Sequence, residues 1–197
     1  MRKTLDQLIS WTGLILAVVL LAAGGLLMYA SNFVHQNVES QLSQQRITMP
    51  AADRLETQEQ KDALAQYAGQ QMTTGDQAKA FADQYILVHM NASSDGRTYE
   101  EVSGEYMQLA KDPNANADEV KALGDLRQSL FMGNALRGML LNAYAFGTMG
   151  TIAFIAGIGA FIASGVLLVL SFFGFRHSKR VNDFVPRDIV SGTPATV

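Results

Sequence analysis

Two stretches decide the fold: residues 8–30 read LISWTGLILAVVLLAAGGLLMYA, and residues 151–173 read TIAFIAGIGAFIASGVLLVLSFF. They lie within longer runs, 7–38 and 138–175, that contain no Asp, Glu, Lys or Arg. A helix of 23 residues is about 34 Å long, which covers a hydrocarbon core about 30 Å thick. Because a soluble domain of this size rarely keeps two such stretches free of charge, both runs predict membrane-spanning helices.

The residues that flank the two runs predict the orientation. Arg2 and Lys3 precede the first run, and the segment RHSKR at 176–180 follows the second. Residues 31–137 instead carry nine Lys or Arg against fifteen Asp or Glu. Basic residues concentrate on the cytoplasmic flanks of membrane spans. We therefore expect a plasma-membrane protein with both termini in the cytoplasm and the middle of the chain outside.

A cleaved signal peptide is the alternative for the first run, but the apolar core is about twice the usual length. A membrane anchor is the better interpretation. The expected organisation is a cytoplasmic tail at 1–7, a first span at 8–30, an extracytoplasmic helical domain at 31–142, a second span at 143–175, and a basic cytoplasmic tail at 176–197 that is disordered at its end.

The segment between the two spans is predicted to be helical throughout. Three S/T-x-x-E/Q sequences, which are typical of helix N-termini, begin at Thr57, Thr74 and Thr98. Apolar residues recur behind them at three- and four-residue spacing, and no alternating strand pattern is present. The expected fold class is therefore all-α, with two transmembrane helices flanking a small extracytoplasmic helical bundle.

Both spanning helices are expected to extend into this domain. Apolar residues from Phe33 to Leu42 continue the first helix to about Arg46, and Met49-Pro50 marks its end. A stripe from Val120 to Leu130 begins a helix that leads into the second span.

Few residues carry recognisable chemistry. The chain has no cysteine, which excludes disulfides and thiolate metal sites. Its three histidines, His35, His89 and His177, fall in separate regions without metal-binding spacing. The acidic middle segment would repel nucleic-acid phosphates. We therefore expect no catalytic residues, no metal, no cofactor and no nucleic-acid partner, and hence no enzyme.

The second span does carry small residues at four-residue spacing, which permit close backbone approach between helices. We expect helix packing on this face, either within one chain or between chains. The alternative is that a chain rich in Ala and Gly produces such spacings without any role in packing. The predicted packing residues are Ala153, Ala156, Gly157, Ala160 and Ser164.

Three long segments, at 1–34, 66–86 and 136–177, resemble a family of uncharacterised actinobacterial two-span membrane proteins, and the match would cover most of the chain. The resemblance implies the envelope of a high-GC Gram-positive cell. Some members carry the label aromatic ring-opening dioxygenase, but such an enzyme needs an iron site of His and carboxylate ligands, which the separated histidines do not provide. The segments are MRKTLDQLISWTGLILAVVLLAAGGLLMYASNFV at 1–34, QYAGQQMTTGDQAKAFADQYI at 66–86, and LRGMLLNAYAFGTMGTIAFIAGIGAFIASGVLLVLSFFGFRH at 136–177.

These observations favour a non-enzymatic integral membrane accessory or scaffolding protein. It would present a helical extracytoplasmic domain to partners in the envelope or in a membrane complex. Besides the lipid bilayer, the expected partner is a membrane or envelope protein, or a second copy. The alternative is an extracytoplasmic ligand sensor that acts through a partner protein. The 22 residues after Phe175 are too few for a signalling domain, which disfavours a sensor that signals by itself.

Overall fold

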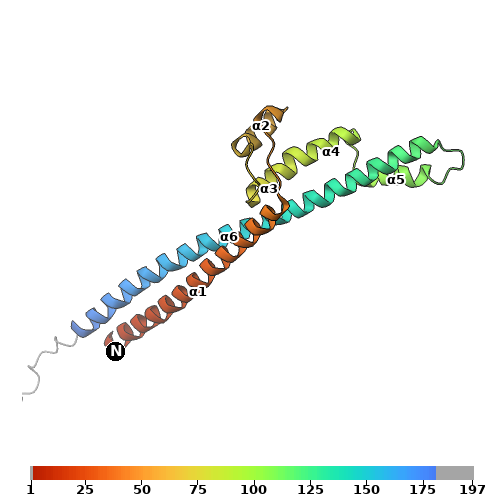
Figure 1. Ribbon diagram of the computed structural model, residues 1–197. Coiled ribbons are helices and arrows are strands. Elements are labelled where there is room, and N and C mark those ends of the chain that lie inside the picture. Colours follow the sequence, from red (N-terminus) through yellow and green to blue (C-terminus); the bar gives the residue numbers. More distant parts are fainter. Residues whose placement is uncertain (1, 181–197) are drawn as a thin grey trace, which may run out of the picture. The chain divides into compact units, whose positions relative to one another are not determined.

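The computed structural model describes residues 2–180, which are helical apart from turns and an isolated β-bridge between Thr48 and Gln71 (Figure 1). No strand occurs in this range, so the all-α prediction is confirmed. The end of the basic tail, predicted to be disordered, lies outside the described residues. In chain order the elements are α1 (Arg2–Gln45), the 3-10 turn η1 (Ala52–Arg54), α2 (Gln58–Leu64), the 3-10 turn η2 (Ala65–Tyr67), α3 (Gly75–Phe81), the π-helix η3 (Ala82–Ile86), α4 (Leu87–Ser94), α5 (Tyr99–Leu109) and α6 (Ala117–Arg180).

The chain divides into two compact units, to both of which α1 and α6 contribute. The first unit contains the residues up to Ala30 together with those from Ala153 onward, and the second is Ser31–Ile152. α1 has 44 residues and α6 has 64. Each contains a window long and apolar enough to cross a membrane.

The ends of the two long helices follow the sequence pattern. α1 ends at Gln45, and Arg46 adopts a left-handed conformation with φ of 52°. The predicted continuation to about Arg46 is therefore confirmed. α6 begins at Ala117, where the side-chain oxygen of Asn116 accepts a hydrogen bond from the Asp118 N–H at 2.9 Å. It continues to Arg180, so the predicted helix that leads into the second apolar run is also confirmed.

Reciprocal capping boxes begin the three helices α2, α3 and α5. In each box the threonine hydroxyl accepts a hydrogen bond from the backbone N–H three residues on, and that residue's side chain accepts one from the threonine N–H. Each N-cap stabilises its helix by about 1 kcal/mol. All three predicted boxes are confirmed: Thr57 with Gln60, Thr74 with Gln77, and Thr98 with Glu101.

The core of the second unit gathers around α3. Leu64 of α2, Ala78 of α3 and Leu140 of α6 are fully buried in it, and Leu42 of α1 is 2% exposed. The N-terminus of α3 lies directly against α6. A Cβ atom on Gly75 would be only 2.9 Å from the Tyr144 Cα atom, so a larger residue at this position would force α3 away from α6.

A π-helix, η3, separates α3 from α4, where the sequence pattern predicts one uninterrupted helix. Its wide turn is closed by the Leu87 N–H, which donates to the Ala82 carbonyl oxygen. Arg137 of α6 donates to the same oxygen through Nε at 3.1 Å. Within η3 Tyr85 is only half-buried, whereas Phe81 just before it is 9% exposed. The buried face of α3 therefore becomes less buried at η3.

Candidate functional site

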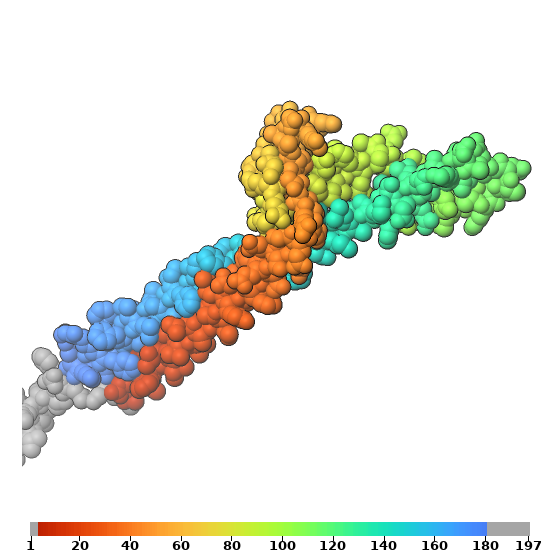
Figure 2. Space-filling view, in the orientation of Figure 1, coloured from red at the N-terminus to blue at the C-terminus, as the bar shows by residue number. Residues whose placement is uncertain are grey.

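Small residues line the contact between α1 and α6 in the first unit. The two helices lie side by side there (Figure 2). Buried positions recur every seven residues on each helix. A seven-residue repeat keeps one face of a helix against its partner, and small residues there let the backbones approach closely. This set, named here the small-residue seam, comprises Ser10, Ala17 and Gly24 on α1, and Gly157, Ser164, Ser171 and Ser178 on α6.

The seam is tight at Gly24 and Gly157. A Cβ atom on Gly157 would lie 3.2 Å from the Met28 Sδ atom and 3.3 Å from the Gly24 carbonyl oxygen. A Cβ atom on Gly24 would lie 3.2 Å from the Gly157 carbonyl oxygen. Larger residues at either position would therefore push the two backbones apart. By contrast, Gly159 and Gly165 of α6 have open space where a Cβ atom would stand.

One buried hydrogen bond crosses the seam. The Ser164 hydroxyl donates to the Ala17 carbonyl oxygen at 2.8 Å. An unpaired hydroxyl in apolar surroundings is costly, so this bond favours one register of α6 against α1. Near one end of the same contact, the rings of Trp11 and Phe175 meet edge to face with centroids 5.6 Å apart.

The structure places the five predicted packing residues differently. Gly157 and Ser164 are buried against α1 of the same chain, while Ala153 and Ala160 are half-buried and Ala156 is exposed. Ser171 and Ser178 also belong to the seam, but the four-residue spacing of small residues does not predict them. The signal that identifies them is the recurrence of a small residue every seven positions from Gly157 onward.

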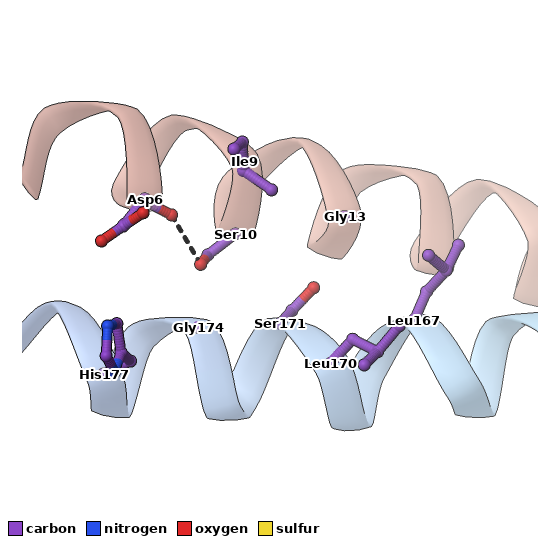
Figure 3. A pocket seen from close by; sticks show the side chains of 9 residues that line it. All are labelled: Asp6, Ile9, Ser10, Gly13, Leu167, Leu170, Ser171, Gly174 and His177. Carbon is purple, nitrogen blue, oxygen red and sulfur yellow. Dashed lines mark hydrogen bonds between the residues drawn. The ribbon is translucent and has the colours of Figure 1, made fainter. Parts of the chain in front are cut away.

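A cavity of about 240 Å³ lies beside the seam, where two glycines leave room between the helices (Figure 3). The Ser10 hydroxyl donates to the Asp6 carbonyl oxygen at 2.7 Å. The buried Ser178 hydroxyl has no hydrogen-bond partner among the described residues. The cavity is lined by apolar side chains as well as by polar ones. Its lining includes Asp6, Ser10 and Gly13 from α1, and Ser171, Gly174 and His177 from α6.

The three histidines are not brought together. His35 and His89 each hydrogen-bond through Nδ1 to the carbonyl oxygen four residues earlier, at 2.9 and 2.7 Å, whereas His177 lines the cavity. Since a carbonyl oxygen can only accept, Nδ1 carries a proton in both bonded rings. Among residues 4–180 no group of three His, Asp or Glu side chains is placed to hold a metal ion.

The second unit contains an ion cluster that joins α3 and η3 to α6. The Asp83 carboxylate accepts a hydrogen bond from Lys79 Nζ at 2.6 Å and another from Arg137 Nη2 at 2.9 Å. The side chains of Asp83 and Arg137 are 25% and 23% exposed. Because Arg137 also binds the Ala82 carbonyl oxygen, this cluster holds the π-helix against α6.

The electrostatics of this cluster favour its charged form. The hydrogen bond from Lys79, aided by that from Arg137, lowers the pKa of the Asp83 carboxyl below its ordinary 3.8, although burial opposes the shift. The same hydrogen bond to Asp83 raises the pKa of the Lys79 ammonium group. Asp83 and Lys79 are therefore both charged at neutral pH, and the cluster is a structural clamp.

No relative identifies the chain. Compared with protein-family models, with curated proteins and with solved structures, it shows no significant match. The property that bears on function is therefore the distribution of polar and apolar side chains over the two units.

The seam can be tested with an engineered disulfide. A Cβ atom on Gly13 would lie 3.8 Å from the Ser171 Cβ atom, within the range of about 3.5–4.5 Å that disulfides require. Because the chain has no native cysteine, the double variant Gly13→Cys, Ser171→Cys should form a single bridge on oxidation. We expect an altered monomer mobility on a non-reducing gel that reverts on reduction.

Adding Ser164→Leu to that double variant should lower the yield of the bridge, because the larger side chain separates the helices and removes the hydrogen bond to Ala17. Gly165→Leu adds the same side chain at the neighbouring position, where a Cβ atom meets open space, and should leave the yield unchanged. Equal yields of the bridge with Ser164→Leu and with Gly165→Leu would contradict the close packing of α1 against α6 along the seam.

The ion cluster predicts how stability depends on pH. A carboxyl whose pKa is lowered by folding contributes stability above its unfolded pKa, and that contribution is lost as the pH falls through its folded pKa. Asp83→Asn should therefore cost about 1–2 kcal/mol at pH 7. It should also reduce the loss of stability below pH 3.8. Denaturant unfolding of the full-length chain in detergent measures both effects.

Asp125→Asn provides the matched control. Lys121 and Asp125 form the same i,i+4 pair at 2.6 Å, but their side chains are 75% and 68% exposed. Exposed pairs contribute little, so this substitution should barely change the stability at either pH. If Asp125→Asn lowered the free energy of unfolding as much as Asp83→Asn does, the clamp would contribute no more to stability than an exposed ion pair.

Proposed function

We propose that the protein is an integral membrane protein whose α1 and α6 both cross the plasma membrane. The observation that carries this proposal is an inside-out distribution of side chains in the first unit. Leu26 is 71% exposed and Ile162 is 64% exposed, and only 11% of the most apolar window of each helix is buried. Surface of this kind is unfavourable in water and favourable in hydrocarbon.

The serine side chains of the two helices in the same unit face inward. Ser10, Ser164, Ser171 and Ser178 are all between 1% and 5% exposed. A helix pair surrounded by water would show the reverse arrangement, with hydroxyls outside and large apolar residues between the helices. Helices in a membrane bury small and hydroxyl-bearing residues at their contacts, where polar groups find partners.

The orientation in the proposal follows the charges. Basic residues crowd both tails, whereas the segment between the spans is acidic, which favours cytoplasmic termini and an extracytoplasmic second unit. The resemblance to actinobacterial two-span proteins supports an actinobacterial plasma membrane as the location.

We further propose that the protein acts by contact, as an accessory or scaffolding subunit without chemistry of its own. The support is apolar surface on a unit that would face water. Phe131 and Met132 of α6 are each more than half exposed there. Exposed apolar side chains of this size mark interaction surfaces. The small-residue seam is occupied within the chain, so the partner would bind the second unit.

Single cysteines test the topology, because the chain has none of its own. Ser93 is exposed and suits a probe in the second unit, whereas its neighbour Ser94 is buried; His177 is exposed at the end of α6. On intact cells an impermeant thiol reagent should label Ser93→Cys and leave His177→Cys unlabelled until the membrane is opened. Labelling of His177→Cys alone would contradict the orientation, and extraction of the chain by alkaline carbonate would contradict membrane insertion.

The contact function is tested by the size of the particle recovered in mild detergent. The protein should be recovered in a complex larger than one chain in its micelle. If the topology holds but only monomers are recovered, before and after crosslinking in native membranes, the contact proposal fails. The ligand sensor would then become the better account.

A further inference from the structure

The cavity beside the small-residue seam has a polar end and an apolar end (Figure 3). Asp6 of α1 and His177 of α6 face each other across the polar end. Leu167 and Leu170 line the other end, ten and seven residues before His177 in the same helix. That spacing corresponds to about 10–15 Å along a helix axis, so the polarity of the lining changes along the direction of the helices.

The polar end lies where the headgroups of a bilayer would be. Asp6 precedes the first charge-free run, and His177 follows the second. Trp11 packs against Phe175 in the same part of the helix pair, and tryptophan is typical of the interface between membrane and water. In the proposed topology the cavity therefore begins among the headgroups of the cytoplasmic leaflet and extends toward the hydrocarbon.

Two hydroxyl groups in this part of the helix pair have no partner among the described residues. The Ser171 side chain lines the cavity and points toward Gly13 of α1 (Figure 3), and the residue is only 5% exposed. Its hydroxyl makes no hydrogen bond within residues 4–180. Ser178, which follows His177, also has a buried hydroxyl without a partner there. Buried hydroxyls are usually hydrogen-bonded, so the polar end favours a ligand that brings polar groups of its own.

The apolar end is open to the surroundings of the helix pair. Ile9 is 64% exposed and Leu170 is 60% exposed, although both line the cavity. The volume of about 240 Å³ holds a polar headgroup but not the acyl chains of a phospholipid. Those chains would lie in the hydrocarbon along the exposed apolar side chains. The shape and the polarity of the site therefore match a lipid better than a water-soluble ligand.

We propose that this cavity binds the headgroup of a cytoplasmic-leaflet phospholipid that carries a primary amine. The Asp6 carboxylate accepts hydrogen bonds from the lipid ammonium group, and the Ser171 hydroxyl donates to a phosphate or ester oxygen. An anionic headgroup without an amine would be repelled by Asp6. The inference rests on the proposed function, because it needs α1 and α6 to cross the membrane with both termini in the cytoplasm.

Retention of defined lipids by the purified full-length chain tests this inference. The protein in mild detergent is mixed with equal amounts of phosphatidylethanolamine, phosphatidylcholine and phosphatidylglycerol that have identical acyl chains. Phosphatidylcholine has a positive charge but no N–H group, and phosphatidylglycerol has no amine. Native mass spectrometry should find phosphatidylethanolamine retained about threefold over either of the others, the scale of a partly exposed ion pair. Equal retention of all three, or a preference for phosphatidylglycerol, would overturn the inference.

Two variants separate the roles of the carboxylate and the hydroxyl. Asp6→Asn keeps the size of the side chain and should remove the preference for phosphatidylethanolamine. Asp125→Asn removes a carboxylate from the second unit and should leave that preference unchanged. Ser171→Ala should lower the retention of all three lipids, because each has a phosphate. An unchanged preference in Asp6→Asn, or unchanged retention in Ser171→Ala, would contradict the site.

Resistance to alkaline carbonate distinguishes a failure of this inference from a failure of the proposed function. A chain that resists extraction but does not discriminate between the three headgroups contradicts the lipid site alone. A chain that alkaline carbonate extracts contradicts both the membrane proposal and the lipid site.

Discussion

The close approach of α1 and α6 along the small-residue seam is the contact on which the first unit depends. Gly24 and Gly157 leave no room for a side chain between the backbones, and Ser164 donates across the contact to Ala17. With the serine hydroxyls inside, large apolar side chains such as Leu26 and Ile162 are exposed on the outside of the pair. An apolar surrounding would make that arrangement favourable, which supports the proposal that this helix pair lies in a membrane.

The second unit has the opposite arrangement, with an acidic surface and an apolar core. Short capped helices cover one side of α1 and α6, and the Asp83 clamp holds the π-helix against Arg137. The other side, lined by Phe33 and Phe146, remains open. A unit with apolar surface uncovered in this way is suited to association with a partner.

Sequence reasoning succeeded where the signal is local. The capping boxes at Thr57, Thr74 and Thr98 and the end of α1 near Arg46 each depend on residues close together in the chain. It missed features that depend on which residues meet. The seven-residue recurrence through Ser171 and Ser178 predicts a helix contact only when it is compared with the matching recurrence on α1. The π-turn beside Asp83 is held by Arg137, which lies 54 residues away in the chain.

Trp11 gives the most direct test of the central claim, that α1 and α6 form a membrane-spanning pair. It is the single tryptophan of the chain, it is 57% exposed, and it lies near one end of the first apolar run. Quenching of its fluorescence by brominated lipids in proteoliposomes measures its depth in the bilayer. The account predicts strong quenching by lipids brominated near the headgroup and weaker quenching by lipids brominated near the chain ends. Fluorescence that no brominated lipid reduces would contradict it.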